Sequence, residues 1–189
     1  MNDAQRKGRL QLIAVAAIFF GPVIAAFGLY YGGIWKPEGQ AVNGQLIEPS
    51  VALTAFDLTA ENGVRLEEIW SLVIIAPGDC PDLCQQVLYE TRQLRRALGK
   101  NSDRVQRVWL YADGQPDAEF MATQHPGLKT INGNQGPGLG LLQTIDSRES
   151  VGLFLVDPKG NLMMQFPAGL SMRGIHTDLK RLLKVSRIG

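Results

Sequence analysis

The feature that most limits what this chain can fold into is an uncharged, largely apolar stretch from Leu10 to Trp35. At ~1.5 Å of rise per residue, about 20 helical residues cover the ~30 Å hydrocarbon layer of a bilayer. Tyr30, Tyr31 and Trp35 gather at its far end, where amphipathic rings favour the headgroup region. We therefore predict one transmembrane helix over residues 10–35, with the lipid bilayer as a partner.

The charges on either side of this stretch predict its orientation. Three basic residues lie between positions 6 and 9, whereas Lys36 is alone on the far side, close to Glu38. The positive-inside rule then places residues 1–9 in the cytoplasm and the rest of the chain in the periplasm. An Arg- and Ser-rich transit region is missing, which favours a bacterial inner membrane over a mitochondrial one.

A cleaved signal peptide is the alternative explanation for the apolar stretch. Signal peptides have an apolar region of usually ~7–15 residues that ends at a small-x-small cleavage site. Residues Ala25–Gly28 match such a site poorly, and the apolar run continues past them. The pattern favours a permanent anchor.

Beyond the anchor, the chain has the length of one domain. Residues 36–50 contain proline and glycine and are predicted to be a linker, which leaves residues 51–189 as a single periplasmic domain. Lys plus Arg total 19 and Asp plus Glu total 18, giving a formal net charge of +1. Such a balance provides no field for nucleic acid, so we expect no nucleic-acid partner.

The hydrophobic periodicity of residues 51–189 indicates an α/β domain. An alternating segment at Leu53–Leu58 followed by the Asn62-Gly63 turn predicts an N-terminal β-hairpin. Further strands are expected at 70–76, 107–112, 151–156 and 161–166, and helices at about 83–100, 117–124 and 171–185, with Leu83, Val87, Leu94 and Leu98 on one stripe of the first helix. Glycine-rich residues 132–140 are predicted to be a connecting loop. This order favours a thioredoxin-like mixed sheet flanked by helices.

The two cysteines, Cys80 and Cys84, lie at the junction between the strand at 70–76 and the following helix. Free backbone N–H groups and the positive helix end stabilise thiolate there, whereas Asp79 and Asp82 oppose it. Residues four apart in a helix are ~6 Å apart along its axis, so the sulfurs can form a disulfide or share a soft metal ion. A purely structural disulfide is the alternative, but a bond across so short a gap is an inefficient staple.

Over residues ~50–185 the sequence resembles the Sco/SenC family of membrane-anchored, thioredoxin-fold proteins. The resemblance rests on Glu61-Asn62-Gly63, the Cys80-Pro81-Asp82-Leu83-Cys84 segment and Leu155–Gly160. It implies a role in cytochrome c oxidase assembly, with the copper-accepting subunit of a respiratory oxidase as partner. It also implies that Cys80 and Cys84 bind copper, cycle to a disulfide, or do both.

One departure makes this chain a divergent member of that family. The family's third copper ligand is a histidine nine residues before the proline of the Asp-Pro-x-Gly turn, a position held here by Glu149. His125 and His176, the two histidines of the chain, are expected to be ordinary polar residues. Glu149 is a hard ligand that suits Cu(I) poorly, and the Met163–Met164 pair is more typical of a core. We expect Cys80 and Cys84 to hold Cu(I) transiently and no stable three-ligand site to form.

Three functional hypotheses follow from these residues. The favoured one is a Sco-like assembly factor that uses Cys80 and Cys84 as a Cu(I) carrier or as a thiol reductant. The second is a general periplasmic thiol-disulfide oxidoreductase, although the Cys-x-x-Cys spacing typical of such enzymes is absent and no proline is obviously placed as the cis-proline facing the dithiol. The third is a non-catalytic scaffold whose site has decayed.

Overall fold

The structure, a computed structural model, consists of two compact units, each of which is described by itself. The units are Met1–Ala41 and Val42–Gly189. The described residues are 3–32, 42–56, 63–145, 151–167, 169, 171–186 and 188.

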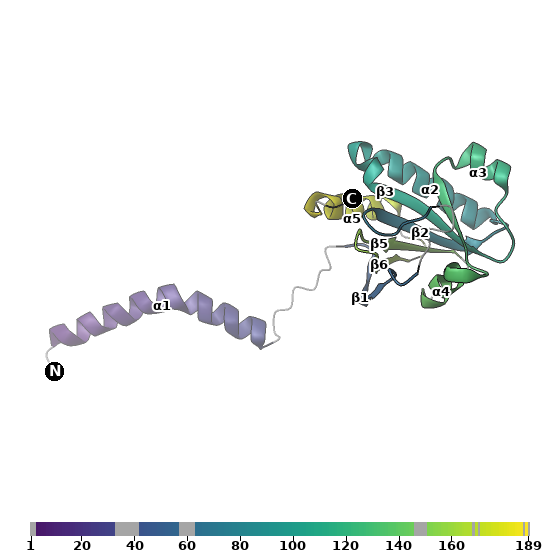
Figure 1. Cartoon of the computed structure of the whole chain (residues 1–189). Helices are drawn as coiled ribbons and strands as arrows, with labels where there is room; N and C mark the ends of the chain where they lie inside the picture. The colour runs from purple at the N-terminus through teal and green to yellow at the C-terminus, as the bar shows by residue number, and fades with distance from the viewer. Residues whose placement is uncertain are drawn as a thin grey trace. The chain divides into compact units, whose positions relative to one another are not determined.

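The first unit contains one helix, α1 (Asp3–Tyr31), drawn in purple in Figure 1. Its segment Arg6–Leu29 contains an 18-residue window with a mean hydropathy of 2.5, so the helix is long and apolar enough to cross a membrane. Phe27 and Tyr31 stack near its end with ring centroids 5.6 Å apart. The predicted helix is therefore present, but it begins earlier than position 10 and ends at Tyr31, and Trp35 lies outside the described residues.

The second unit is built on one six-stranded sheet with the order β1-β6-β5-β2-β3-β4. The strands are β1 (Gln45–Ala52), β2 (Trp70–Pro77), β3 (Val105–Ala112), β4 (Leu128–Asn132), β5 (Gly152–Val156) and β6 (Asn161–Phe166). The helices are α2 (Asp82–Ala97), the 3₁₀ helix η1 (Gly99–Arg104), α3 (Ala118–Gln124), α4 (Gly136–Thr144) and α5 (Met172–Val185). Strands β2, β3 and β4 are parallel, whereas β5 is antiparallel to β2, and β6 and β1 continue antiparallel. The predicted mixed sheet is confirmed.

Both faces of the sheet are covered, because β2 and β3 send apolar side chains in both directions. On one face, Trp109 packs in a cluster with Leu88 of α2 and Leu179 of α5. On the other, Val73 packs in a cluster with Leu141 of α4. Figure 1 shows α2 and α4 on opposite sides of the strands, as expected for a sheet flanked by helices.

The predicted N-terminal hairpin is wrong. The first strand, β1, lies largely inside the segment predicted as linker 36–50, and it pairs with β6 at the edge of the sheet. Residues 53–56 form turns, residues 63–69 make only an isolated bridge, and residues 57–62 lie outside the described residues. The alternation that predicted a hairpin has another cause: Leu53, Val64 and Leu66 are buried in the cluster that contains α4.

The glycine-rich segment 132–140 is also not the loop that was predicted. Strand β4 extends to Asn132, and α4 begins at Gly136 with Pro137 in its first turn, where a missing N–H is tolerated. A side chain on Gly138 would collide with the carbonyl oxygen of Asn132. Glycine here permits close packing of helix against strand.

A buried carboxylate fixes the start of the second unit. Asp178 of α5 is fully buried and accepts hydrogen bonds from the backbone N–H of Asn43 at 2.7 Å and of Gly44 at 2.9 Å. The Asn43 side chain donates a third, at 2.9 Å. Segment 42–44 is therefore held on α5 before β1 begins.

Candidate functional site

Cys80 and Cys84 form a disulfide whose Cα atoms are 5.1 Å apart. Cys80 precedes α2, Pro81 caps the helix, and Cys84 lies in its first turn. Cys80 exposes 5% of its surface and Cys84 exposes none. The structure thus joins the two residues proposed from the sequence and buries both, with Cys80 the less completely buried, whereas their chemistry stays a prediction.

The disulfide lies at a topological switch point of the sheet, where successive strands stop being added on one side of β2 and are added on the other. From β2 the chain adds β3 and β4 on one side, and it then returns to place β5 on the other side of β2. In open α/β sheets, such switch points at strand ends are where ligands and substrates bind, because the connecting loops part there. Cys80 follows the end of β2 at this point.

Backbone contacts hold the loop that carries Cys80. The N–H of Gly78 donates to the carbonyl oxygens of Asp113 at 2.6 Å and Ala112 at 3.1 Å. A Cβ added to Gly78 would lie 2.6 Å from the backbone of Gly114 and Gln115, so only glycine allows the two loops to meet. Sequence reasoning had assigned Gly78 merely to the end of a strand.

Cys80 itself adopts a left-handed conformation, with φ of 46°, which residues other than glycine rarely adopt. Its N–H donates to the Pro77 carbonyl at 3.1 Å, and its carbonyl accepts from the Gln85 side chain, also at 3.1 Å. Backbone conformations of this kind persist only where the surroundings enforce them. The loop therefore presents Cys80 in one fixed orientation.

The start of α2 provides the electrostatic environment of the pair. Pro81 offers no side-chain cap to the first turn, so the N–H groups there and the positive end of the helix dipole remain available to a thiolate. Two exposed carboxylates, Asp79 and Asp82, flank the site and oppose that effect. The helix end thus stabilises a cysteine thiolate and the neighbouring carboxylates destabilise it, as the sequence indicated.

His125 lies at the opposite edge of the parallel strands. It follows α3 and precedes β4, whereas Cys80 follows the end of β2. Its ring packs edge-on against Phe120 with centroids 4.8 Å apart, and its Nδ1 has no hydrogen-bond partner among the described residues. Burial, followed by the charges of Arg107 and Arg92, lowers the pKa of His125 to about 4. The ring is neutral, and its position excludes it as a ligand beside the dithiol.

Arg107 lies next to this histidine on β3 and is also buried. Its guanidinium donates to the Leu88 carbonyl at 3.3 Å. Burial, with the charges of Arg95 and Arg92, lowers the pKa of Arg107 to about 10. This corner of the domain, defined by His125 and Arg107, is here called the histidine corner.

His176 also lies far from the site, and Met163 and Met164 lie on β6, which β5 separates from β2. His176 on α5 lies 3.3 Å from the carbonyl of Ala97, the last residue of α2, so a 16-residue helix, ~24 Å long, separates it from the disulfide. Met164 is buried in β6, with its thioether next to Gly44, and Met163 is half-buried. Glu149 lies outside the described residues.

These positions decide how well copper fits. Within the described residues, no group of three or more His, Cys, Asp or Glu side chains is arranged to hold a metal ion. The described part of the chain therefore offers copper two sulfurs, and these only after the disulfide is reduced. Among the described residues no third His, Cys, Asp or Glu side chain accompanies these two sulfurs, and the absence of a stable three-ligand site stays a prediction.

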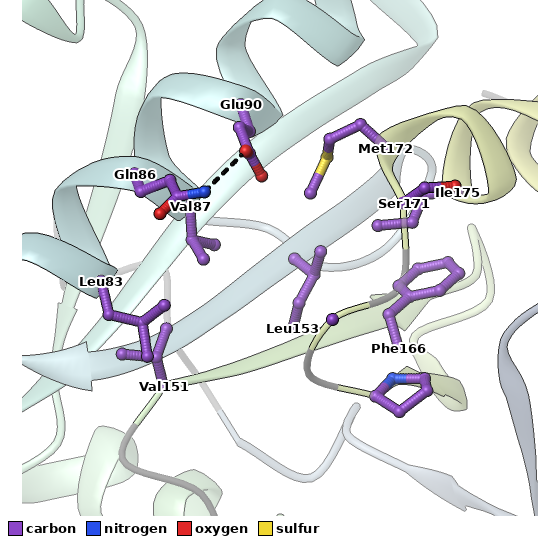
Figure 2. Close-up of a pocket in the computed structure, with 12 residues that line it drawn as sticks. Leu83, Gln86, Val87, Glu90, Val151, Leu153, Phe166, Ser171, Met172 and Ile175 are labelled. Carbon is purple, nitrogen blue, oxygen red and sulfur yellow. Dashed lines mark hydrogen bonds between the residues drawn. The ribbon is translucent and has the colours of Figure 1, made fainter.

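A groove runs along α2, from Leu83 to Glu90, and is bounded on its other side by α5 (Figure 2). Its volume is about 360 Å³, and its lining includes Leu83, Val87 and Glu90 of α2. Here the predicted inward stripe of α2 needs correction, because Leu83 is 50% exposed and the buried residues are Cys84, Leu88, Thr91 and Leu94. The stripe is rotated because Cys84 itself faces the core.

Comparison with known families decides what this chain is. Residues 70–186, more than half of the chain, match the family described as "Transmembrane-like, thioredoxin-like, C-terminal domain". The chain belongs to this family. The companion description "Transmembrane-like, N-terminal domain" matches residues 2–33, which contain the apolar helix α1. No curated protein sequence matches the chain.

Solved structures show the same fold in Sco proteins. Yeast Sco1 with copper bound superimposes with a TM-score of 0.55 and 16% identity over 64% of this chain and 82% of that one. Apo Sco1 from Thermus thermophilus superimposes with a TM-score of 0.55 and 16% identity, over 75% of this chain and 96% of that one. Arabidopsis thaliana ScoI with copper bound superimposes with a TM-score of 0.51 and 17% identity, over 64% of this chain and 88% of that one. The predicted resemblance to Sco proteins is confirmed as a likeness of fold.

Proposed function

We propose that this membrane-anchored, thioredoxin-like protein reduces a disulfide in the copper-accepting subunit of a respiratory cytochrome c oxidase. The observation that carries the proposal is the Cys80–Cys84 pair, which bonds reversibly in principle and lies at the switch point of the sheet with Cys80 the more exposed. In the proposal, α1 spans the bacterial inner membrane with its N-terminus in the cytoplasm, and the domain acts in the periplasm.

The chemistry needs both thiols. The Cys80 thiolate attacks one sulfur of the partner's disulfide, which forms a mixed disulfide and releases the partner's other sulfur as a thiolate. The Cys84 thiolate then attacks Cys80 Sγ, which closes the Cys80–Cys84 disulfide and releases the second partner thiolate. Two electrons pass to the partner, whose two thiolates take up two protons, and a reduced dithiol protein must restore the starting state.

A kinetic assay tests this proposal directly. The full chain in detergent, first reduced, is mixed with the oxidised soluble domain of a copper-accepting oxidase subunit, and free thiols are alkylated and counted over time. We expect wild type to transfer electrons, a Cys84→Ser variant to stop at the mixed disulfide, and a Cys80→Ser variant to be inactive. Equal rates for wild type and a variant lacking both cysteines would end the proposal.

Carriage of Cu(I) is a second candidate, favoured by one observation. The two sulfurs of the reduced pair lie side by side, and two thiolates can hold Cu(I) in linear geometry. The Sco structures of the same fold from yeast and Arabidopsis have copper bound. Anaerobic titration with Cu(I) decides this, because affinity no better than that of the Cys80→Ser, Cys84→Ser double variant removes the candidate.

Two other functions give different outcomes. A general thiol-disulfide oxidoreductase would reduce unrelated oxidised proteins as fast as the oxidase subunit, whereas the proposed function requires a preference for that subunit. A non-catalytic scaffold would leave oxidase assembly normal in cells that carry the double serine variant. We expect oxidase assembly to fail both in that strain and in one lacking the gene.

A further inference from the structure

The groove beside the dithiol has one apolar floor and one charged rim. Leu153, Phe166 and Ile175 are almost fully buried beneath it, and Met172 of α5 faces α2 across it. Within the described lining, Glu90 is the single charged residue, and its carboxylate accepts a hydrogen bond from Gln86 at 3.0 Å. Figure 2 shows Leu83, Val87 and Glu90 in succession along one wall.

Leu83 lines one end of the groove, lies between the two cysteines in sequence and belongs to the same helical turn as Cys84, although neither cysteine is among the described lining residues. Leu83 is 50% exposed and lines the groove, so its side chain is open to contact with a bound side chain. From Leu83 to Glu90 the helix advances roughly 10 Å, at ~1.5 Å per residue. That distance corresponds to about three residues of extended chain at ~3.3 Å each.

We infer that this groove binds the polypeptide segment that flanks the reactive cysteine of the substrate, taking an apolar side chain about two residues from that cysteine and a basic side chain about three residues from it. The inference rests on the proposed exchange at Cys80 and names the substrate class for it. The apolar side chain covers Leu83, Val87 and the floor, and the basic side chain meets Glu90. The Glu90 carboxylate attracts a basic side chain of the substrate and repels an acidic one.

A panel of disulfide-linked peptides tests the inference on the full, reduced chain. Each peptide carries Leu or Ser two residues from its cysteine, followed by Lys or Glu at the third position, and kcat/KM for reduction is measured. We expect wild type to prefer Leu over Ser by about tenfold or more, because the pocket buries the larger apolar side chain. Lys should be preferred over Glu by a smaller factor.

Two variants and one control assign these preferences to the groove. Leu83→Ser should reduce the Leu-over-Ser ratio to about twofold or less, and Glu90→Gln should abolish the Lys-over-Glu preference. Tyr89→Ser changes a side chain of the same helix that is 57% exposed and outside the groove lining, and it should leave both ratios unchanged. Ratios are compared within each variant, so a general change in dithiol reactivity cancels.

The outcomes separate this inference from the proposed function. If wild type reduces all four peptides and oxidised glutathione but shows equal kcat/KM for Leu and Ser peptides, the groove is not the substrate site and exchange at Cys80 stands. If wild type reduces the oxidised soluble domain of the copper-accepting subunit but none of the peptides, the inference alone fails. If it reduces neither that domain nor the peptides, the proposed function fails and the inference fails with it. Unchanged ratios in Leu83→Ser, with a preference present in wild type, also overturn the inference.

Discussion

The dithiol and the histidine corner are both buried, both polar, and both set against the same face of the sheet. Cys80 follows the end of β2, whereas His125 precedes the start of β4, so they occupy opposite edges of the parallel strands. Leu83, the residue before Cys84, lines a groove of about 360 Å³. His125 is instead packed against Phe120 and held neutral by burial and by Arg107 and Arg92.

This difference shows that burial of a reactive group does not make a site by itself. A histidine whose pKa is lowered by packing contributes to the pH dependence of folding, but nothing in its position gives a substrate access. The dithiol combines a fixed loop, a helix end and adjacent open space. Position in the topology, at the switch point, is what distinguishes the two.

The largest expected effect comes from the glycine that supports the dithiol loop. Gly78→Ala places a Cβ 2.6 Å from backbone atoms of Gly114 and Gln115, which must then move. We expect a loss of about 3 kcal/mol in the free energy of unfolding, typical of overpacking, together with slower exchange at Cys80. Denaturant unfolding and the thiol assay measure the two effects.

Gly127→Ala, next to the histidine corner, is the matched control for that substitution. Gly127 has a φ of 76° and open space around the added Cβ, so its cost is only the left-handed strain, roughly 1 kcal/mol. The rate of thiol-disulfide exchange at Cys80 should be unaffected in this variant. If Gly78→Ala were as mild as Gly127→Ala and exchanged at the wild-type rate, the claimed role of the Gly78 contact would be wrong.

A second expected effect is a dependence of stability on pH that originates at His125. The pKa of the ring falls from the ordinary 6.5 to about 4 on folding, so the unfolded chain takes up the proton first as the pH drops. Stability from the neutral ring is complete above pH 6.5 and is lost as the pH falls toward 4, by roughly 2.5 kcal/mol between pH 7 and 4.5.

Unfolding measured across this pH range checks the effect. The His125→Gln variant should lose less stability on acidification than wild type, whereas His176→Gln should follow the wild-type curve. Parallel curves for wild type and His125→Gln would show that the ring titrates normally in the folded state.

The smallest expected effect is on stability when the disulfide is reduced. A bond between residues four apart closes a very short loop, so chain entropy accounts for no more than about 2 kcal/mol. Reduced and oxidised protein should both unfold cooperatively, with similar midpoints by circular dichroism. Unfolding on reduction would mean that the bond is a structural disulfide. The dithiol would then resemble the histidine corner, because it would stabilise the fold without reacting with a substrate.

The sequence predicted the central strands well, because apolar runs such as residues 70–76 have few alternative structures. The edges were predicted poorly. Strand β1 contains Pro49, which is tolerated on an edge strand but hides the strand pattern, and Leu53, Val64 and Leu66 cover a sheet face instead of forming a hairpin.

For the site, the sequence spacing correctly predicted that Cys80 and Cys84 lie close together, but not how, because Cys80 precedes α2 with a φ of 46° and does not share a helical turn with Cys84. The contact between Gly78 and the loop at Gly114 joins segments more than thirty positions apart, so no local pattern predicts it. The exposed Leu83 was missed because helical periodicity gives the spacing of a stripe but not its rotation relative to the core.

The central claim, that Cys80 attacks a partner disulfide and Cys84 resolves the product, is tested most directly by trapping. Membranes from cells that express the full chain with Cys84→Ser are alkylated, and covalent adducts are identified by mass spectrometry. The account predicts a mixed disulfide between Cys80 and a cysteine of a copper-accepting oxidase subunit, with none in a Cys80→Ser strain. Adducts formed through Cys84 in the Cys80→Ser strain, or no adduct in either strain, would contradict it.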